Sequence, residues 1–79
     1  MKKIITLDKL KINEEATVIN IDSKCKLKRR FEDLGIVKGT IIKKEFYSIF
    51  KDPCAYLIKG SLIAIRNDSS KHIKVNKND

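Results

Sequence analysis

The side chains of this 79-residue chain that are best suited to chemistry are two cysteines and one histidine. Cys25, Cys54 and His72 offer the sulfur and nitrogen ligands that ferrous iron accepts. Their spacing matches no ligand motif and the cysteines form no C-x-x-C pair, so we expect free thiols and no bound metal or cofactor. No nucleophile has a base and an orienting partner, and there is no glycine-rich phosphate loop, which argues against an enzyme.

The net charge of the chain limits the classes of partner that we expect. Lys and Arg number 18 against 10 Asp and Glu, a formal net charge of +8, which favours an acidic protein, a nucleic acid or an anionic lipid. There is no signal-peptide pattern and no apolar stretch long enough for a membrane span, so we expect a cytoplasmic protein. The length predicts one domain over residues 1–75 and a polar tail over 76–79, with binding at the surface rather than in an enclosed pocket.

A helix is predicted over residues 24–34. Leu27, Phe31 and Leu34 recur at i, i+4 and i+7 and form one apolar stripe, which we expect to be buried. Gly35 follows the stripe at the position where a helix most often ends in a left-handed residue. We expect Asp22 or Ser23 to cap the start of this helix, because a short polar side chain there accepts a bond from an early backbone N–H.

The remaining elements are predicted to be mostly strands. Gly39 turns the chain out of the helix, and Lys59-Gly60 forms a hairpin turn. A short leucine-containing arm precedes the first long strand and is expected to hold one helical turn and to clip onto the barrel. The predicted fold is mainly β, a small barrel of about five strands with one short α-helix inserted after the first long strand. The strands are expected at residues 16–21, 40–45, 54–59, 61–66 and 73–75.

The charges of the predicted helix oppose its dipole, and two interpretations of its basic residues remain open. In the first, Lys26, Arg29 and Arg30 contact an acidic partner. In the second, Arg29 pairs weakly with Asp33 at i,i+4, and the stem of Arg30 covers the core while its guanidinium bonds loop carbonyls. Both interpretations leave this segment at the surface.

The segment 46–50 contains three of the five aromatic residues of the chain. If the strand before it ends near Glu45, the segment is an apolar loop tip, and exposed aromatic clusters are the usual anchors of protein interfaces. If the strand continues, alternate residues fill the core. We expect Tyr47 and Phe50 to contact a partner and Phe46 to lie in the core.

Several motifs together resemble those of the small FeoA proteins of bacterial ferrous iron uptake, and the C-terminal SH3-like domain of iron-responsive repressors. The resemblance spans nearly the whole chain. The sequence departs from the family pattern at Phe31 (usually Leu), Lys38 (usually Pro), Ser70 (usually Ala) and Asn13 (commonly Gly). The motifs that carry the resemblance are Arg29-Arg30-Phe31-Glu32-Asp33-Leu34-Gly35-Ile36-Val37-Lys38-Gly39-Thr40, Asp52-Pro53, Gly60-Ser61-Leu62-Ile63-Ala64-Ile65-Arg66 and Ser70-Lys71-His72-Ile73-Lys74-Val75.

The resemblance implies an SH3-like fold and a cytosolic accessory protein that binds FeoB, the membrane transporter with a GTPase domain. The leading alternative from another class is a basic small barrel that binds nucleic acid. Base-stacking platforms need aromatic residues interleaved with Lys and Arg, and outside segment 46–50 only Tyr56 lies on a predicted strand. We therefore expect a protein partner and no nucleic acid.

Overall fold

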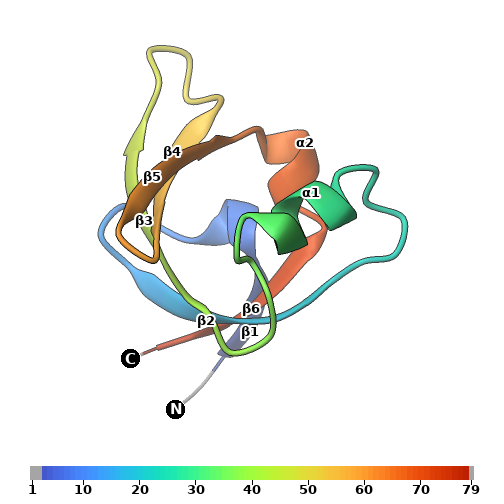
Figure 1. Ribbon diagram of the computed structural model, residues 1–79. Helices are drawn as coiled ribbons and strands as arrows, with labels where there is room; N and C mark the ends of the chain where they lie inside the picture. The colour runs from blue at the N-terminus through green and yellow to red at the C-terminus, as the bar shows by residue number, and fades with distance from the viewer. Residues whose placement is uncertain (1–2, 79) are drawn as a thin grey trace.

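The computed structural model describes residues 3–78 (Figure 1). The first two residues of the predicted domain and the last residue of the predicted tail lie outside this range. The described chain contains six strands, two short α-helices and one 3₁₀ turn. Their bounds are β1 Lys3–Thr6, η1 Leu7–Lys9, β2 Glu15–Ile21, α1 Lys28–Asp33, β3 Ile41–Tyr47, β4 Cys54–Ile58, β5 Ser61–Ile65, α2 Asn67–Ser70 and β6 Ile73–Lys77.

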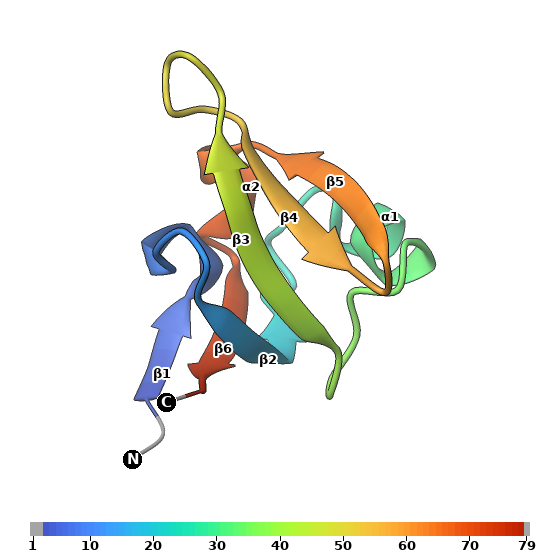
Figure 2. The ribbon, with the colours of Figure 1, turned by 90° about the vertical axis from the view of Figure 1, so that its left-hand side faces the viewer.

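All six strands belong to one sheet in the order β1-β6-β2-β3-β4-β5, and all neighbours are antiparallel. Figures 1 and 2 show this sheet curled around a central core. Helices α1 and α2 lie on the side of the barrel between β5 and β6, which are not paired with each other. The mainly β barrel with a helix after the first long strand is confirmed. The N-terminal arm supplies one more strand than predicted, because Ile5 in β1 lies opposite Val75 in β6.

The core is built from alternate side chains of the strands. On β2 and β6 the inward positions are apolar and the positions between them face outward. Tyr56 on β4 is wholly buried, and its hydroxyl lies 3.5 Å from the carbonyl oxygen of Leu7. Burial raises the pKa of Tyr56 above its usual value. This ring is therefore part of the core and is closed to any stacking partner.

The helix is shorter than predicted because the chain before it forms turns. Helix α1 begins at Lys28, and no side chain caps its first residues. The carboxylate of Asp22 instead accepts a bond from the backbone N–H of Lys24 at 2.9 Å, which lowers the pKa of Asp22. The expected cap at Asp22 or Ser23 is wrong, since this bond closes a turn several residues ahead of α1.

The end of α1 has the predicted geometry. Gly35 has a φ of +97°, and its N–H donates to the carbonyl oxygen of Glu32 at 3.0 Å. The N–H of Ile36 donates to the carbonyl oxygen of Phe31 at 2.9 Å, which completes a Schellman ending. A β-carbon at Gly35 would also meet the side chain of Lys59 at 3.2 Å, so glycine suits both the backbone and the packing here.

The predicted apolar stripe is buried at only one of its three positions. Phe31 is buried, whereas Leu27 and Leu34 are 42% and 43% exposed. The expectation of a core role for Leu27 and Leu34 is therefore wrong. A helix of only six residues reaches the core through a single side chain, and its other apolar residues project beside the barrel.

The turns predicted at glycines are present. Lys59 and Gly60 have φ values of +51° and +83° and join β4 to β5 in a two-residue hairpin loop. Asn13 and Gly39 also have positive φ, at +70° and +92°. The last strand is longer than predicted. β6 ends at Lys77, so residues 76 and 77, which we predicted to belong to a polar tail, extend the strand.

Candidate partner-binding surface

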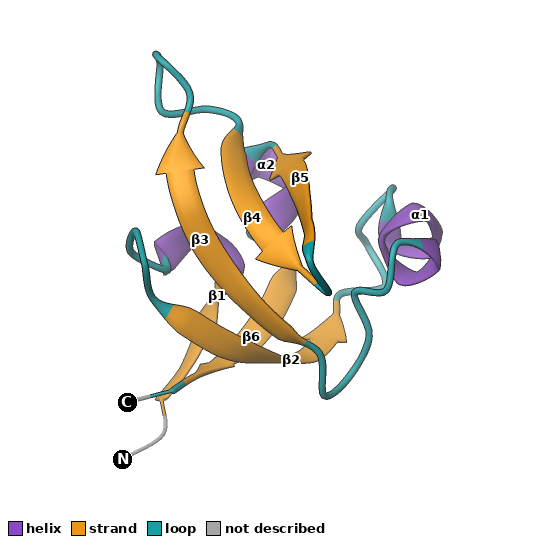
Figure 3. Cartoon of the chain, turned by 60° about the vertical axis from the view of Figure 1, so that its left-hand side comes forward, coloured by secondary structure: helices purple, strands orange, loops and turns teal. Residues whose placement is uncertain are grey.

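The hairpin of β3 and β4 projects from the barrel and ends in a loop (Figures 2 and 3). Its loop is tight, because Lys51 donates its backbone N–H to Ser48 at 2.9 Å and Ser48 donates to Pro53 at 3.1 Å. Ile49 and Phe50 stand at the centre of this turn and are 93% and 88% exposed. We call residues 48–51 the apex. It displays two large apolar side chains with almost no cover from the rest of the chain.

Phe46 does not lie in the core as predicted. It is 53% exposed, and Tyr47 beside it is 44% exposed. The register of β3 against β4 shifts between Lys44 and Phe46, which is the mark of a β-bulge. Because an extra residue reverses the alternation of side chains, the inward series of Ile42 and Lys44 does not continue to Phe46. Phe46 thus lies on the outer face of the sheet, while Tyr47 lies on the opposite face with Lys44 and stays partly exposed next to the apex.

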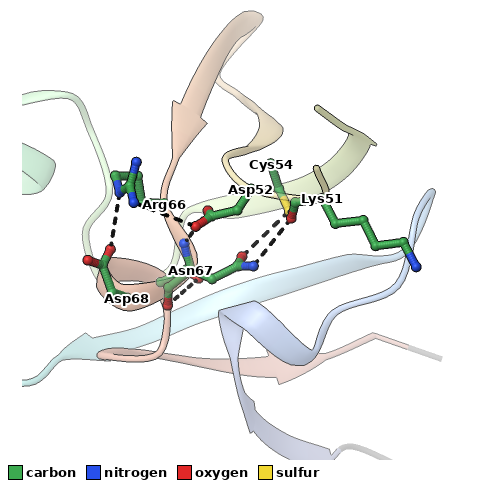
Figure 4. Close-up of polar contacts among 7 residues, drawn as sticks. Lys51, Asp52, Cys54, Arg66, Asn67 and Asp68 are labelled. Carbon is green, nitrogen blue, oxygen red and sulfur yellow. Dashed lines mark hydrogen bonds and ion pairs between the residues drawn. The ribbon is translucent and has the colours of Figure 1, made fainter. Parts of the chain in front are cut away.

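Polar contacts tie the base of the apex to the start of α2 (Figure 4). The carboxylate of Asp52 accepts a bond from the backbone N–H of Asn67 at 2.8 Å, and the Asn67 side chain donates to the Lys51 carbonyl oxygen at 3.3 Å. The buried thiol of Cys54 lies 3.5 Å from that same oxygen and 3.6 Å from the Asn67 side-chain oxygen. Arg66 approaches Asp52 at 3.9 Å. The apex is therefore held in one position relative to the barrel.

In the middle of β3 the structure buries a lysine that sequence reasoning missed. Lys44 is only 3% exposed, and its ammonium donates to the carbonyl oxygens of Leu10 at 2.7 Å and Asp8 at 3.2 Å. It also lies 5.3 Å from the ring centre of Tyr47 and 5.8 Å from that of Tyr56. The signal was present in the alternation of β3. Lys44 follows inward-facing Ile42 by two residues, and so shares its face.

The basic residues singled out in the sequence gather at a different place. Lys26, Arg29 and Arg30 are all exposed at α1 or just before it. None of the three makes an ion pair with a described residue, so the pairing of Arg29 with Asp33 does not form. Figures 1 and 2 both place α1 well away from the apex. The aromatic and the basic candidates are thus two separate surfaces rather than one patch.

The residues considered for iron are only partly brought together. Cys25 and His72 line one surface pocket, whereas Cys54 lies at the base of the apex. Both cysteines are buried free thiols. Over residues 3–78 there is no group of three or more His, Cys, Asp or Glu side chains placed to hold a metal ion. No helix in the same range is long and apolar enough to cross a membrane.

These features define a small antiparallel barrel of the SH3-like type that displays an apolar apex and a basic helix. The sequence model of the FeoA domain family matches residues 5–77, which is nearly the whole chain. The chain belongs to the FeoA family, a family of small accessory proteins associated with ferrous iron transport.

Three relatives illustrate the similarity. A candidate Fe(2+) transport protein A from Campylobacter jejuni is 29% identical over 72 residues, which cover 91% of this chain and 97% of the relative. The solved structure of a FeoA-like protein from Clostridium acetobutylicum is 35% identical with a TM-score of 0.84, covering 95% of this chain and 87% of that one. The FeoA protein from Chlorobium tepidum is 27% identical with a TM-score of 0.87, covering 95% and 71%.

Proposed function

We propose that this chain is a cytoplasmic accessory protein of bacterial ferrous iron uptake that binds the membrane transporter FeoB and modulates its state. In this proposal the chain catalyses no reaction itself. Its membership of the FeoA family supports a role in ferrous iron transport. The observation that carries a binding role is the apex, where large apolar side chains stand outside the core on a loop whose base is hydrogen-bonded to α2.

Tyr47 and Phe50 are the proposed anchors on the partner. Rigid aromatic side chains that become fully desolvated are typical centres of binding energy. Complete burial of a side chain such as Phe50 contributes about 1.5–3 kcal/mol, which corresponds to roughly a tenfold to hundredfold change in affinity. The network around Asn67 lowers the cost of binding, because the apex is already ordered before it meets the partner.

Lys26, Arg29 and Arg30 form the second proposed contact. Exposed cations without partners steer an acidic surface toward the protein and mainly raise the association rate. Their separation from the apex means that a partner touching both must span the face between α1 and the β3–β4 hairpin. A large membrane protein with a cytoplasmic GTPase domain is able to do so.

Calorimetric titration of the purified chain against detergent-solubilised FeoB from the same source, at low and high salt, tests the proposal. We expect saturable binding that survives high salt, since the apex contributes an apolar term. Replacing both Tyr47 and Phe50 by serine should weaken binding by at least about tenfold. Ile41→Ser is the matched control, because Ile41 is also an exposed apolar residue of β3 but lies at its opposite end.

Two results would contradict the proposal. Unchanged affinity of the Tyr47→Ser, Phe50→Ser double variant with a native circular dichroism spectrum would reject the apex as the anchor. Absence of binding to FeoB, together with retention on RNA or heparin that falls steeply with salt, would instead favour nucleic-acid binding driven by the net charge of +8. The burial of Tyr56 weighs against that alternative, since it removes one of the few aromatic rings that could stack on a base.

A further inference from the structure

The sheet ends at β5 with an unpaired edge. β5 pairs with β4 along its whole length, from Ser61 opposite Ile58 to Ile65 opposite Cys54. Within residues 3–78 no hydrogen bond joins the outer edge of β5 to another segment. The backbone groups along this edge are therefore available to another chain.

This edge lacks the features that usually prevent another strand from adding to the edge of a sheet. Edge strands are commonly protected by charged residues, proline or a bulge. β5 reads Ser-Leu-Ile-Ala-Ile, without a charge or a proline, and its register against β4 is continuous. The opposite edge of the sheet differs, since β1 is shorter and begins with Lys3. β5 is thus the edge of this sheet that is best suited to accept a strand.

A groove of about 250 Å³ runs between β5 and α1. Residues 63–66 line it without a gap. Because side chains of a strand alternate between its two faces, four consecutive residues line one groove only where the strand presents its edge. The opposite wall is apolar and includes Leu27, Phe31 and Leu34 of the α1 segment. Figure 3 shows β5 at the limit of the sheet with α1 beside it.

This groove explains why Leu27 and Leu34 are exposed. Both lie on the wall that faces β5, where a chain inserted along the edge would cover them. Arg30 also lines the groove and makes no ion pair with a described residue, whereas Arg66 is already close to Asp52 and Asp68. A carboxylate on the inserted chain would be attracted to Arg30.

We propose that the edge of β5 and the apolar side of α1 together bind an extended segment of a partner polypeptide. The segment adds as a seventh strand along β5, its alternate apolar residues pack on Leu27 and Leu34, and an acidic residue lies by Arg30. Only an extended backbone supplies donors and acceptors that match those of the strand edge. The proposed function uses this surface through Arg30 alone, and the test below omits FeoB, so either proposal can fail without the other.

The test is a titration of the full ¹⁵N-labelled chain with a cyclic β-hairpin peptide of alternating Val and Thr that carries a Glu at the end of its free edge. We expect amide shifts at residues 61–65 and at Leu27 and Leu34 by about 1 mM peptide, with slower hydrogen exchange along β5. The same peptide with N-methylated backbone amides on its free edge should give no such shifts. Absence of shifts with the unmodified peptide, or shifts confined to the apex, would overturn the proposal.

Two variants test whether the peptide binds in the groove along β5. Ala64→Lys places a charge inside the groove and should weaken peptide binding by at least about tenfold. Ile41→Lys is its control, because it adds the same charge to an exposed position of β3, whose edges are both paired, and should leave binding unchanged. Equal loss in both variants would overturn the proposal.

Charge exchange tests the role of Arg30. Arg30→Glu should weaken binding of the Glu-bearing peptide by about fivefold, and a peptide with Lys in place of Glu should recover it. If neither the wild type nor Arg30→Glu distinguishes the Glu-bearing peptide from the Lys-bearing one, the acidic residue is no longer part of the proposal.

Sedimentation of the chain alone tests whether a second copy of the chain occupies the groove instead. A concentration-dependent dimer that Ala64→Lys abolishes and the peptide does not displace would overturn the partner segment in favour of self-association.

Discussion

The middle of the β3–β4 hairpin and its tip reverse the usual positions of charged and apolar side chains. In the middle of β3 Lys44 is buried, whereas Ile49 and Phe50 at the tip stand almost fully in solvent. The buried ammonium is compensated inside the chain by the carbonyl oxygens of Asp8 and Leu10. The side chains of Ile49 and Phe50 are not covered in a comparable way by other described residues. The burial of the lysine is therefore explained by folding, whereas the exposure of the apex is the basis of its proposed role in binding a partner.

The largest effect is expected at the buried lysine. Lys44→Ala leaves two buried carbonyl oxygens without their donor and opens space in the core, so it should lower the free energy of unfolding by about 2–4 kcal/mol. Urea unfolding measures this. Lys43→Ala is the control, because Lys43 is partly exposed beside Glu45 and should cost less than about 1 kcal/mol. Equal losses at the two lysines would show that the Lys44 contacts are unimportant.

A smaller loss is expected where the apex is attached to the barrel. Asn67→Ala removes the side-chain bond to the Lys51 carbonyl oxygen and should cost about 1–2 kcal/mol. It should also speed hydrogen exchange of the Ser48 and Lys51 amides, which close the apex turn. Asn20→Ala on the exposed face of β2 is the control. Unchanged exchange in the Asn67 variant would mean that the apex is ordered without this network.

The ion pair between Glu14 and Lys77, next to Lys44, should give a weaker, pH-dependent effect. Glu14 accepts bonds from Lys77 at 2.7 Å and from the backbone of Lys11 at 2.8 Å, and the Lys77 bond chiefly lowers the pKa of Glu14 below its usual 4.5. A lowered folded-state pKa stabilises the fold above the usual value, and this gain is lost as pH falls through the folded value. Glu14→Gln should therefore flatten the acid limb of a urea-unfolding series, and Glu15→Gln should not. Parallel curves for wild type and Glu14→Gln would contradict this.

The smallest effect on stability is expected at the apex itself. Phe50→Ser should change the free energy of unfolding by no more than about 0.5 kcal/mol, because the ring contacts little of the folded chain. Thermal unfolding followed by circular dichroism would show this. A loss above about 1.5 kcal/mol would mean that Phe50 packs in the folded protein, and the contrast between the middle of the hairpin and its tip would then disappear.

Local patterns made much of this protein readable from its sequence. Gly35, placed directly after the last apolar residue of a helical repeat, predicted the end of α1, and Lys59-Gly60 predicted the hairpin between β4 and β5. These features depend on backbone preferences within a few residues, and such preferences act in any context. The positions of β2 to β6 along the chain followed in the same way from short β-branched runs between turns, whereas β1 was not predicted.

Which side chains lie inside was decided only by the tertiary structure. A single bulge in β3 turned Phe46 outward, and the short helix α1 left Leu34 facing the groove along β5. The separation of α1 from the apex likewise depends on how distant segments pack. Residue types and their spacing determined the elements and the family. Which side chains are buried, which are exposed and which edge of the sheet stays unpaired depend on contacts between residues far apart in the chain. Local sequence does not encode these contacts.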